Sequence, residues 1–284
     1  MKIAIASGKG GTGKTLLATN LFAVVRDAGR SVALVDCDAE VPNDSVFVRG
    51  AIRGKTPVKM LCPEINTEAC RMCGECARNC AFHAITCIPQ MNYIKLLADL
   101  CHGCAACIVE CPHEAIREGW KQIGEVTALA CDGGQMLYEG RIREGEHSPV
   151  EIIREAIAEG EASGADVLIL DAPPGCSCPF VNTVSKADRV VLITEPTPFG
   201  LSDLQHAVEV LRRIGKSFSV VINRCDLGTG IMQQWLQDEE IEVLAEIPYS
   251  EQVARLYSAG KLVVEHSPAM REIMEGITQK LGIV

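Results

Sequence analysis

Short apolar runs alternate with amphipathic stretches along most of the chain, and this pattern is typical of an α/β protein. The first apolar run covers residues 2–6. A glycine-rich stretch follows, and after it apolar residues recur at helical spacing as far as Gly29. A second apolar run, 32–36, ends in aspartates. A strand, a loop, a helix and a second strand in this order predict the opening of a parallel sheet.

The same alternation continues in the second half of the chain. There we predict two β-rich stretches at 123–131 and 136–142, strands at 166–171, 189–195, 217–224 and 241–248, and helices at 149–162, 179–186, 201–215 and 268–282. Aromatic residues make up only 4% of the chain, so the core is expected to be aliphatic. The predicted fold is a doubly wound, mostly parallel α/β sheet.

The alternation stops between about residues 57 and 118, where ten of the fifteen cysteines lie. This segment contains an internal repeat with a period of 31 residues, from Cys70 to Cys101. We interpret residues 57–120 as a small α+β domain of two related halves. It is inserted into a larger domain formed by residues 1–56 and 121–284.

Composition and charge narrow the class of protein. The 27 Lys and Arg residues against 37 Asp and Glu residues give a net charge of −10, which disfavours binding to bare nucleic acid. No apolar run reaches the roughly 18 residues of a membrane span, and the N-terminus does not resemble a secretory signal. An odd number of cysteines without such a signal indicates a reducing compartment and bound metal. We therefore expect a cytoplasmic protein that does not act at a membrane.

The glycine-rich stretch, GKGGTGKT at residues 8–15, satisfies the phosphate-loop pattern G-x-x-x-x-G-K-[ST] between a strand and a helix. Backbone N–H groups of such a loop surround phosphate oxygens, and the helix N-terminus adds partial positive charge. Lys14 is expected to contact the β- and γ-phosphates, and Thr15 to ligate Mg²⁺. A glycine-rich turn without a ligand is the disfavoured alternative. The predicted nucleotide-binding residues here are Gly8, Gly10, Gly11, Thr12, Gly13, Lys14 and Thr15.

Three aspartates follow buried strands, where a carboxylate can reach Mg²⁺ or the attacking water. Asp36 and Asp38 end the second strand, and Asp171 ends the strand at 166–171. We predict Asp36 and Asp171 as ligands of Mg²⁺ or of its bound water. Helix caps or ordinary strand-end aspartates are the alternative for all three.

The phosphate loop contains a second lysine, Lys9, and with it the sequence resembles the deviant Walker A ATPases, the group of MinD, ParA, Mrp and the nitrogenase iron protein. The resemblance implies an ATP-dependent homodimer in which Lys9 reaches the partner's nucleotide; a solvated loop lysine is the alternative. It also implies that Asp38 is the switch I aspartate that orients the nucleophile and that Asp171 lies at the switch II position. The base contacts that it implies are Asn223, Pro248 and Tyr249.

The spacing C-x2-C-x2-C-x3-C occurs twice in the inserted segment, and it resembles that of bacterial two-cluster ferredoxins, where the fourth cysteine serves the other cluster. The resemblance implies one [4Fe–4S] cluster on Cys70, Cys73, Cys76 and Cys111, and a second on Cys101, Cys104, Cys107 and Cys80. One departure is that Pro112 follows Cys111, whereas Ala81 follows Cys80. Two zinc sites are the alternative. The clusters would act as an electron conduit or as structural staples.

A further pair, Cys176 and Cys178, follows directly on Asp171 in the stretch DAPPGCSCP. One chain offers two thiolates there, and a symmetric dimer offers four, enough for a metal ion or cluster that bridges the two subunits. Spare thiols, or a disulfide between the two, are the alternatives.

The whole chain resembles Mrp/MinD-type ATPases that carry an inserted ferredoxin domain. The resemblance implies an ATPase that uses ATP and Mg²⁺, and that assembles, carries or inserts a metal–sulfur centre into a client apoprotein. An ATP-gated electron donor, similar to the nitrogenase iron protein and acting on a redox partner, is the second hypothesis. A MinD-like positioning protein is disfavoured, because the C-terminal segment lacks a basic amphipathic face.

Overall fold

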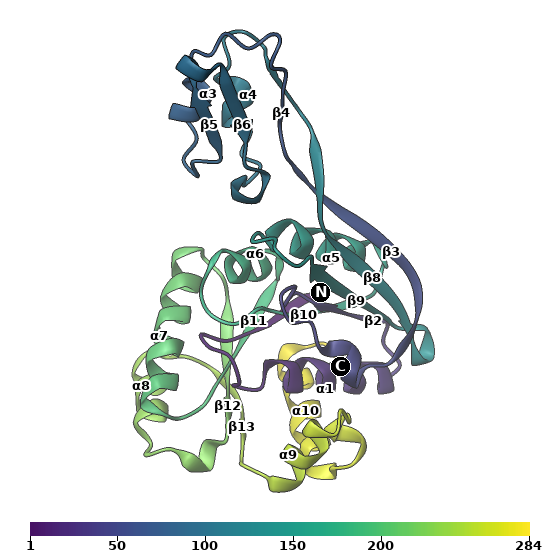
Figure 1. Cartoon of the computed structure of the whole chain (residues 1–284). Coiled ribbons are helices and arrows are strands. Elements are labelled where there is room, and N and C mark those ends of the chain that lie inside the picture. The colour runs from purple at the N-terminus through teal and green to yellow at the C-terminus, as the bar shows by residue number, and fades with distance from the viewer.

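The computed structural model describes all 284 residues, and its centre is a nine-stranded sheet (Figure 1). The order across the sheet is β13 (Val243–Ile247), β12 (Phe218–Asn223), β11 (Arg189–Thr194), β1 (Lys2–Ala6), β10 (Val167–Asp171), β2 (Val32–Asp36), β9 (Met136–Ile142), β8 (Trp120–Cys131) and β3 (Gly50–Leu61). The strands from β13 to β9 are parallel, and β8 and β3 are antiparallel to their neighbours. The mostly parallel α/β sheet predicted from the sequence is therefore confirmed.

Helices cover both faces of the sheet, and each face has its own apolar core. One layer consists of α1 (Lys14–Asp27), α9 (Glu251–Ser258) and α10 (Pro268–Leu281), and the other of α5 (Val150–Ala162), α6 (Cys178–Lys186), α7 (Pro198–Arg213) and α8 (Ile231–Asp238). Because both faces of the central strands are covered, these strands are apolar throughout, as in other parallel sheets. No helix is long and apolar enough to span a membrane.

Most predicted elements agree with the structure to within a few residues, but α8 and α9 were not predicted. Helix α9 buries none of its residues fully, and α8 buries only Met232 and Leu236, so neither shows a long apolar stripe. A four-residue helix, α2 (Asp44–Phe47), also follows β2.

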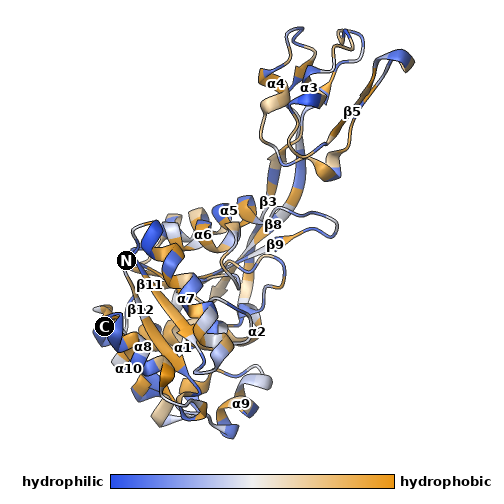
Figure 2. Ribbon diagram, turned by 90° about the vertical axis from the view of Figure 1, so that its left-hand side faces the viewer, coloured by the Kyte–Doolittle hydropathy of each residue, from blue (hydrophilic) through white to orange (hydrophobic).

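The last two strands of the sheet continue beyond it as an antiparallel ribbon that carries a separate lobe (Figures 1 and 2). Strands β3 and β8 pair from Gly50 and Cys131 to Leu61 and Trp120. The predicted boundaries near residues 57 and 120 thus fall on this ribbon, and the lobe itself comprises residues 62–119. Strand β3 was not predicted, because most of its residues are exposed and it has no buried apolar run.

The lobe is a small α+β unit of two similar halves. Its elements are the strand pairs β4 (Glu64–Ile65) with β7 (Ile116–Arg117) and β5 (Ile85–Ile88) with β6 (Tyr93–Leu96), and the short helices α3 (Glu75–Arg78) and α4 (Ala106–Val109). Its apolar core is a cluster of only four buried residues, Cys76, Ile85, Cys107 and Ile116. A unit of this size with so small a core usually needs metals, disulfides or other cross-links to be stable.

We predict that Phe180→Ala lowers the free energy of unfolding by about 3–5 kcal/mol, because Phe180 anchors α6 against the sheet and is fully buried. Urea denaturation of the nucleotide-free protein measures this loss. The matched control is Phe199→Ala in the first turn of α7, where the side chain is 79% exposed. That variant should change stability by no more than about 0.5 kcal/mol. Equal losses in the two variants would contradict the packing described here.

Candidate functional site

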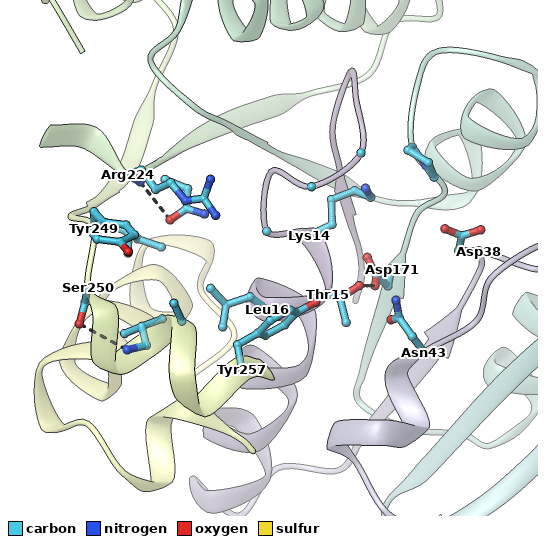
Figure 3. A pocket seen from close by; sticks show the side chains of 18 of the residues that line it. Lys14, Thr15, Leu16, Asp38, Asn43, Asp171, Arg224, Tyr249, Ser250 and Tyr257 are labelled. Carbon is cyan, nitrogen blue, oxygen red and sulfur yellow. Dashed lines mark hydrogen bonds between the residues drawn. The ribbon is translucent and has the colours of Figure 1, made fainter. Parts of the chain in front are cut away.

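A cavity of about 400 Å³ lies at the carboxyl ends of the parallel strands (Figure 3). Its wall combines the loop after β1, the segments after β2 and β10, the end of β12 and the start of α9. The predicted residues that line it are Gly10, Gly11, Gly13, Lys14, Thr15, Asp38, Asp171, Asn223, Pro248 and Tyr249. Crevices at this edge of an α/β sheet are the usual ligand sites of such folds. Gly8, Lys9, Thr12 and Asp36 lie outside the lining.

Two glycines of the phosphate loop are required by close approach. A Cβ atom on Gly8 would lie 2.2 Å from the carbonyl oxygen of Asp203 in α7. Gly13 precedes α1 with φ +107°, and a Cβ atom there would lie 2.7 Å from Nδ2 of Asn223. The loop is therefore held between α7 and β12, and it leads into the first turn of α1, whose N–H groups can bind phosphate.

The Thr15 hydroxyl and the Asp171 carboxylate lie together on the floor of the cavity. Thr15 Oγ1 donates a hydrogen bond of 2.7 Å to Asp171 Oδ2, and the other carboxylate oxygen is buried without a partner. Burial raises the pKa of Asp171 to about 6, although the Thr15 hydroxyl and the Lys14 ammonium oppose this rise. Burial lowers the pKa of Lys14, and the charges of Asp171 and Asp38 oppose that shift.

Asp36 shapes the loop after β2 instead of facing the cavity. Its carboxylate accepts backbone N–H bonds from Asp38, Asn43 and Asp44, at 3.0, 2.7 and 3.0 Å. Burial and the neighbouring Asp171 raise its pKa well above the ordinary value. The predicted role in holding Mg²⁺-bound water stays a prediction, and the structure adds a role in fixing the loop that presents Asp38.

Asp44 was missed from the sequence, and it adds a further buried carboxyl group beside Asp36 and Asp171. It is fully buried at the start of α2, neither of its oxygens has a hydrogen-bond donor, and its pKa is raised well above the ordinary value by burial and by both neighbours. With Lys14 as the buried amine of the cavity, this collection of carboxyl groups favours a bound cation. Mg²⁺ usually takes one or two protein oxygens and completes its shell with phosphate and water, so Thr15 and Asp171 fit it.

No group of three or more His, Cys, Asp or Glu side chains converges closely enough to hold a single metal ion.

Asn223, the last residue of β12, forms hydrogen bonds both with the phosphate loop and with the backbone that follows β12. Its Nδ2 donates to the carbonyl oxygen of Thr12 at 2.8 Å, and its Oδ1 accepts the backbone N–H of Arg224 at 3.0 Å. The Arg224 side chain lines the cavity and forms an ion pair of 2.7 Å with Glu195. Asn223 therefore ties the phosphate loop to the end of β12, in addition to its predicted contact with adenine.

Tyr257 of α9 is a lining residue that sequence reasoning missed. Its ring stacks on Phe47 of α2, with ring centres 4.6 Å apart and an angle of 24° between the planes. Burial raises its pKa, and the nearby charges of Asp171 and Asp44 add to the rise. The C-terminal part of the chain is thus in contact with the segment that follows Asp38.

The lobe contains two further cavities, and each is lined by four cysteines from both halves of the repeat. The first is lined by Cys70, Cys73, Cys76 and Cys111. The second is lined by Cys80, Cys101, Cys104 and Cys107. These are the two sets that the ferredoxin pattern groups together.

Backbone N–H groups point at the sulfur atoms of both sets in the same way. Donors from Met72 and Gly103 lie 3.4 and 3.5 Å from Sγ of Cys70 and Cys101. Donors from Ala84 and Ala115 lie 3.2 and 3.3 Å from Sγ of Cys80 and Cys111. All fifteen cysteines are free, and such N–H contacts stabilise thiolate sulfur in iron–sulfur sites, so both cavities fit four-thiolate clusters.

Cys176 and Cys178 lie on a segment that begins at the nucleotide cavity. Pro174 lines the cavity, and the N–H of Gly175, which has φ +86°, donates to the carbonyl of Ser7 at 3.2 Å. Cys176 is half-buried against the core, and burial raises its pKa; Cys178 is exposed in the first turn of α6. A shift of the phosphate loop would therefore reach both thiols.

Comparison with known proteins agrees with this geometry. A family model described as the CobQ/CobB/MinD/ParA nucleotide binding domain matches residues 3–263. An uncharacterised protein of Methanocaldococcus jannaschii is 27% identical over 282 residues, which cover 97% of this chain and 96% of that protein. An iron-sulfur cluster carrier protein of Pyrococcus horikoshii is 21% identical to this chain, and the match covers 99% of this chain and 85% of that protein. The solved structure of the MinD cell division protein of Aquifex aeolicus has a TM-score of 0.58 at 19% identity, covering 99% and 96% of the two chains.

We predict that Asn223→Ala weakens ADP binding about 5- to 100-fold, because the variant leaves the Thr12 carbonyl without its buried donor and frees the phosphate loop. Isothermal titration with Mg-ADP measures the change. Ser219→Ala is the control: it lies on the same strand and loses a side-chain hydrogen bond to Glu242, away from the cavity. Equal affinities of the Asn223 variant and the wild type would show that this tie does not hold the loop.

Proposed function

This chain belongs to the CobQ/CobB/MinD/ParA family of nucleotide-binding proteins, and we propose that it is a dimeric ATPase that assembles, carries or inserts a metal–sulfur centre into client proteins. One observation carries the proposal: the segment that ends in Cys176 and Cys178 starts at the wall of the nucleotide cavity. The name of the Pyrococcus horikoshii relative, an iron-sulfur cluster carrier protein, supports the same function.

The residues of the cavity fit hydrolysis of ATP by in-line attack of water. Lys14 would bind the β- and γ-phosphates, and Asp38 would orient the attacking water. Thr15 and Asp171 would bind the Mg²⁺ that accompanies the nucleotide. When bound, Mg²⁺ neutralises charge on the phosphates. Lys9 is half-buried and lies outside the cavity of its own chain, which agrees with a role at the partner's nucleotide.

We propose that the lobe is a two-cluster ferredoxin-like domain inserted into an ATPase domain formed by residues 1–56 and 121–284. Its two cysteine-lined cavities would hold one [4Fe–4S] cluster each, with the ligand sets assigned above. Each cluster would supply a one-electron redox centre and would also cross-link the small core of the lobe.

In this proposal the transferred metal–sulfur centre is the protein's substrate and not one of its resident cofactors. In a two-fold symmetric dimer, Cys176 and Cys178 of both chains would offer four thiolates to one ion or cluster. Closure of the dimer on ATP would bring the four sulfurs together, and hydrolysis would separate them and release the centre. This arrangement explains why the thiols follow the switch II aspartate so closely.

An ATP-gated electron donor is the second candidate function. The lobe favours it, because two clusters on an extended ribbon are suited to receiving electrons from a partner. In that case the centre at Cys176 and Cys178 stays on the protein and only changes its redox state. The two functions therefore differ in whether metal leaves the protein.

We predict that Lys9→Ala still binds ATP but hydrolyses it about 10³-fold more slowly, if Lys9 stabilises the transition state as an arginine finger does. Steady-state phosphate release and nucleotide titration separate the two effects. Lys186→Ala, a change at the end of α6, is the control and should retain full turnover. Undiminished turnover of the Lys9 variant would rule out a composite site.

We predict that Cys176→Ser/Cys178→Ser keeps about eight iron atoms per chain in the lobe but cannot restore activity to aconitase stripped of its cluster. The reason is that only the pair beside switch II carries the transferable centre. Anaerobic reconstitution, iron and sulfide analysis and the aconitase assay measure both parts. The control is Cys70→Ser, which should lose lobe iron. Equal transfer by wild type and double variant would contradict the carrier function. A wild-type centre that only changes redox state would favour electron transfer.

A further inference from the structure

Lys121 makes the one side-chain hydrogen bond that reaches the lobe from outside it. It lies at the start of β8, and its Nζ donates to the carbonyl oxygen of Ala98 at 2.8 Å. The same ammonium forms an ion pair of 2.7 Å with Glu146, from the loop between β9 and α5. The two side chains are only 18% and 19% exposed, so water screens this pair less than it screens surface pairs. Lys121, itself on the ribbon strand β8, thus connects the outer end of the ribbon both to the lobe, through Ala98, and to the body, through Glu146.

The carbonyl that Lys121 binds belongs to a cysteine loop. Ala98 O also accepts the backbone N–H of Cys101 at 3.2 Å, so one oxygen receives both the lysine and the first cysteine of the second cavity. Gly103 of the same loop packs against the ribbon, where an added Cβ atom would lie 2.9 Å from the carbonyl oxygen of Leu61. A displacement of Lys121 therefore moves the loop that carries Cys101.

Hydrogen bonds also lead from Glu146 back to the nucleotide cavity. The Glu146 N–H donates to the carbonyl of Arg143 at 3.1 Å, and Arg143 adjoins Ile142, the last residue of β9. The Ile142 N–H donates to the carbonyl of Ala39 at 2.9 Å, and Ala39 is the neighbour of Asp38. Hydrogen bonds and adjacent backbone residues thus form a continuous chain of contacts from Asp38 at the cavity to Lys121 and the loop of Cys101.

The other half of the lobe has no such connection. Its equivalent loop, 67–73, follows Asn66, whose own Oδ1 accepts the N–H groups of Glu68 and Ala69 at 3.0 and 3.3 Å. No side chain from outside the lobe contacts it through a hydrogen bond. The repeat therefore produces two similar cysteine loops, of which one is anchored locally and the other through the ATPase body.

We propose that Lys121, together with Glu146, is a positioning residue that couples the nucleotide state at Asp38 to the loop of Cys101, and leaves the loop of Cys70 unaffected. The inference rests on nucleotide binding in the proposed function. Binding that shifts the segment after β2 moves Ala39, and the shift passes through Ile142 and Glu146 to the lysine. The coupling is reciprocal, so the state of the Cys101 loop also affects nucleotide affinity.

Hydrogen–deuterium exchange of the anaerobically purified holoprotein tests this coupling, with and without Mg²⁺ and a non-hydrolysable ATP analogue. Protection at residues 8–16 and 36–46 reports binding. We expect exchange at 98–104 to change about fivefold or more with nucleotide, the lower end of typical coupling, while 67–73 does not respond. Lys121→Gln and Glu146→Gln should each abolish the response at 98–104 and retain protection at 8–16.

Two further variants separate coupling from simple stability. Lys121→Arg keeps the charge and should retain the response. Lys55→Gln breaks the ion pair between Lys55 and Glu125, which lies on the same ribbon but makes no contact with the lobe. This variant should also retain the response at 98–104.

The remaining outcomes of the exchange experiment would each contradict one part of the proposal. Protection at 8–16 without a response at 98–104, or a response that survives in Lys121→Gln and Glu146→Gln, shows that Lys121 does not couple the sites. A response at 67–73 equal to that at 98–104 shows that the ribbon alone moves the lobe. Absence of protection at 8–16 shows that the proposed nucleotide binding is wrong, and the coupling falls with it.

Discussion

The burial of Asp36 and Asp171 side by side is the constraint on which the rest of the structure depends. These residues face each other in register at the carboxyl ends of two adjacent parallel strands, β2 and β10. Two carboxylates in such a position raise each other's pKa unless donors and cations surround them. The Thr15 hydroxyl, the Lys14 ammonium and three N–H groups of the loop after β2 supply part of this compensation. The phosphate loop and the segment after β2 are therefore held in place by the same buried charges that lie at the floor of the cavity.

Much of this arrangement could be predicted from the sequence, because its determinants are local. Glycines that need positive φ, aspartates at strand ends and cysteines with fixed spacing all lie close together along the chain. The residues that were missed act through contacts between distant segments. Tyr257 approaches Thr15 from a helix without a buried face, and Asp44 is recognised only by its burial. Lys121 resembles any surface lysine until its carbonyl acceptor, 23 residues away, is known.

The sequence repeat also shows the limits of inference from pattern. Both halves of the lobe repeat their cysteines at the same spacing, and this symmetry predicts two equivalent sites. The structure agrees for the cavities and for the N–H groups that point at sulfur. It differs in what holds each loop, because only the loop of Cys101 accepts a side-chain hydrogen bond from outside the lobe. Tertiary contacts thus give two loops of the same sequence pattern different anchors, one within the lobe and the other at Lys121.

The ribbon has an evolutionary consequence as well. Its strands pair down to Leu61 and Trp120, so the lobe begins and ends at neighbouring backbone positions. Because the ribbon leaves from the outermost strand of the sheet, removal of residues 62–119 would require only a hairpin turn to reconnect β3 and β8. None of the parallel strands beneath the nucleotide cavity would change register. The edge of this sheet is therefore a place where a gene can gain, lose or exchange the whole cysteine-rich lobe in one step, while the rest of the chain continues to fold.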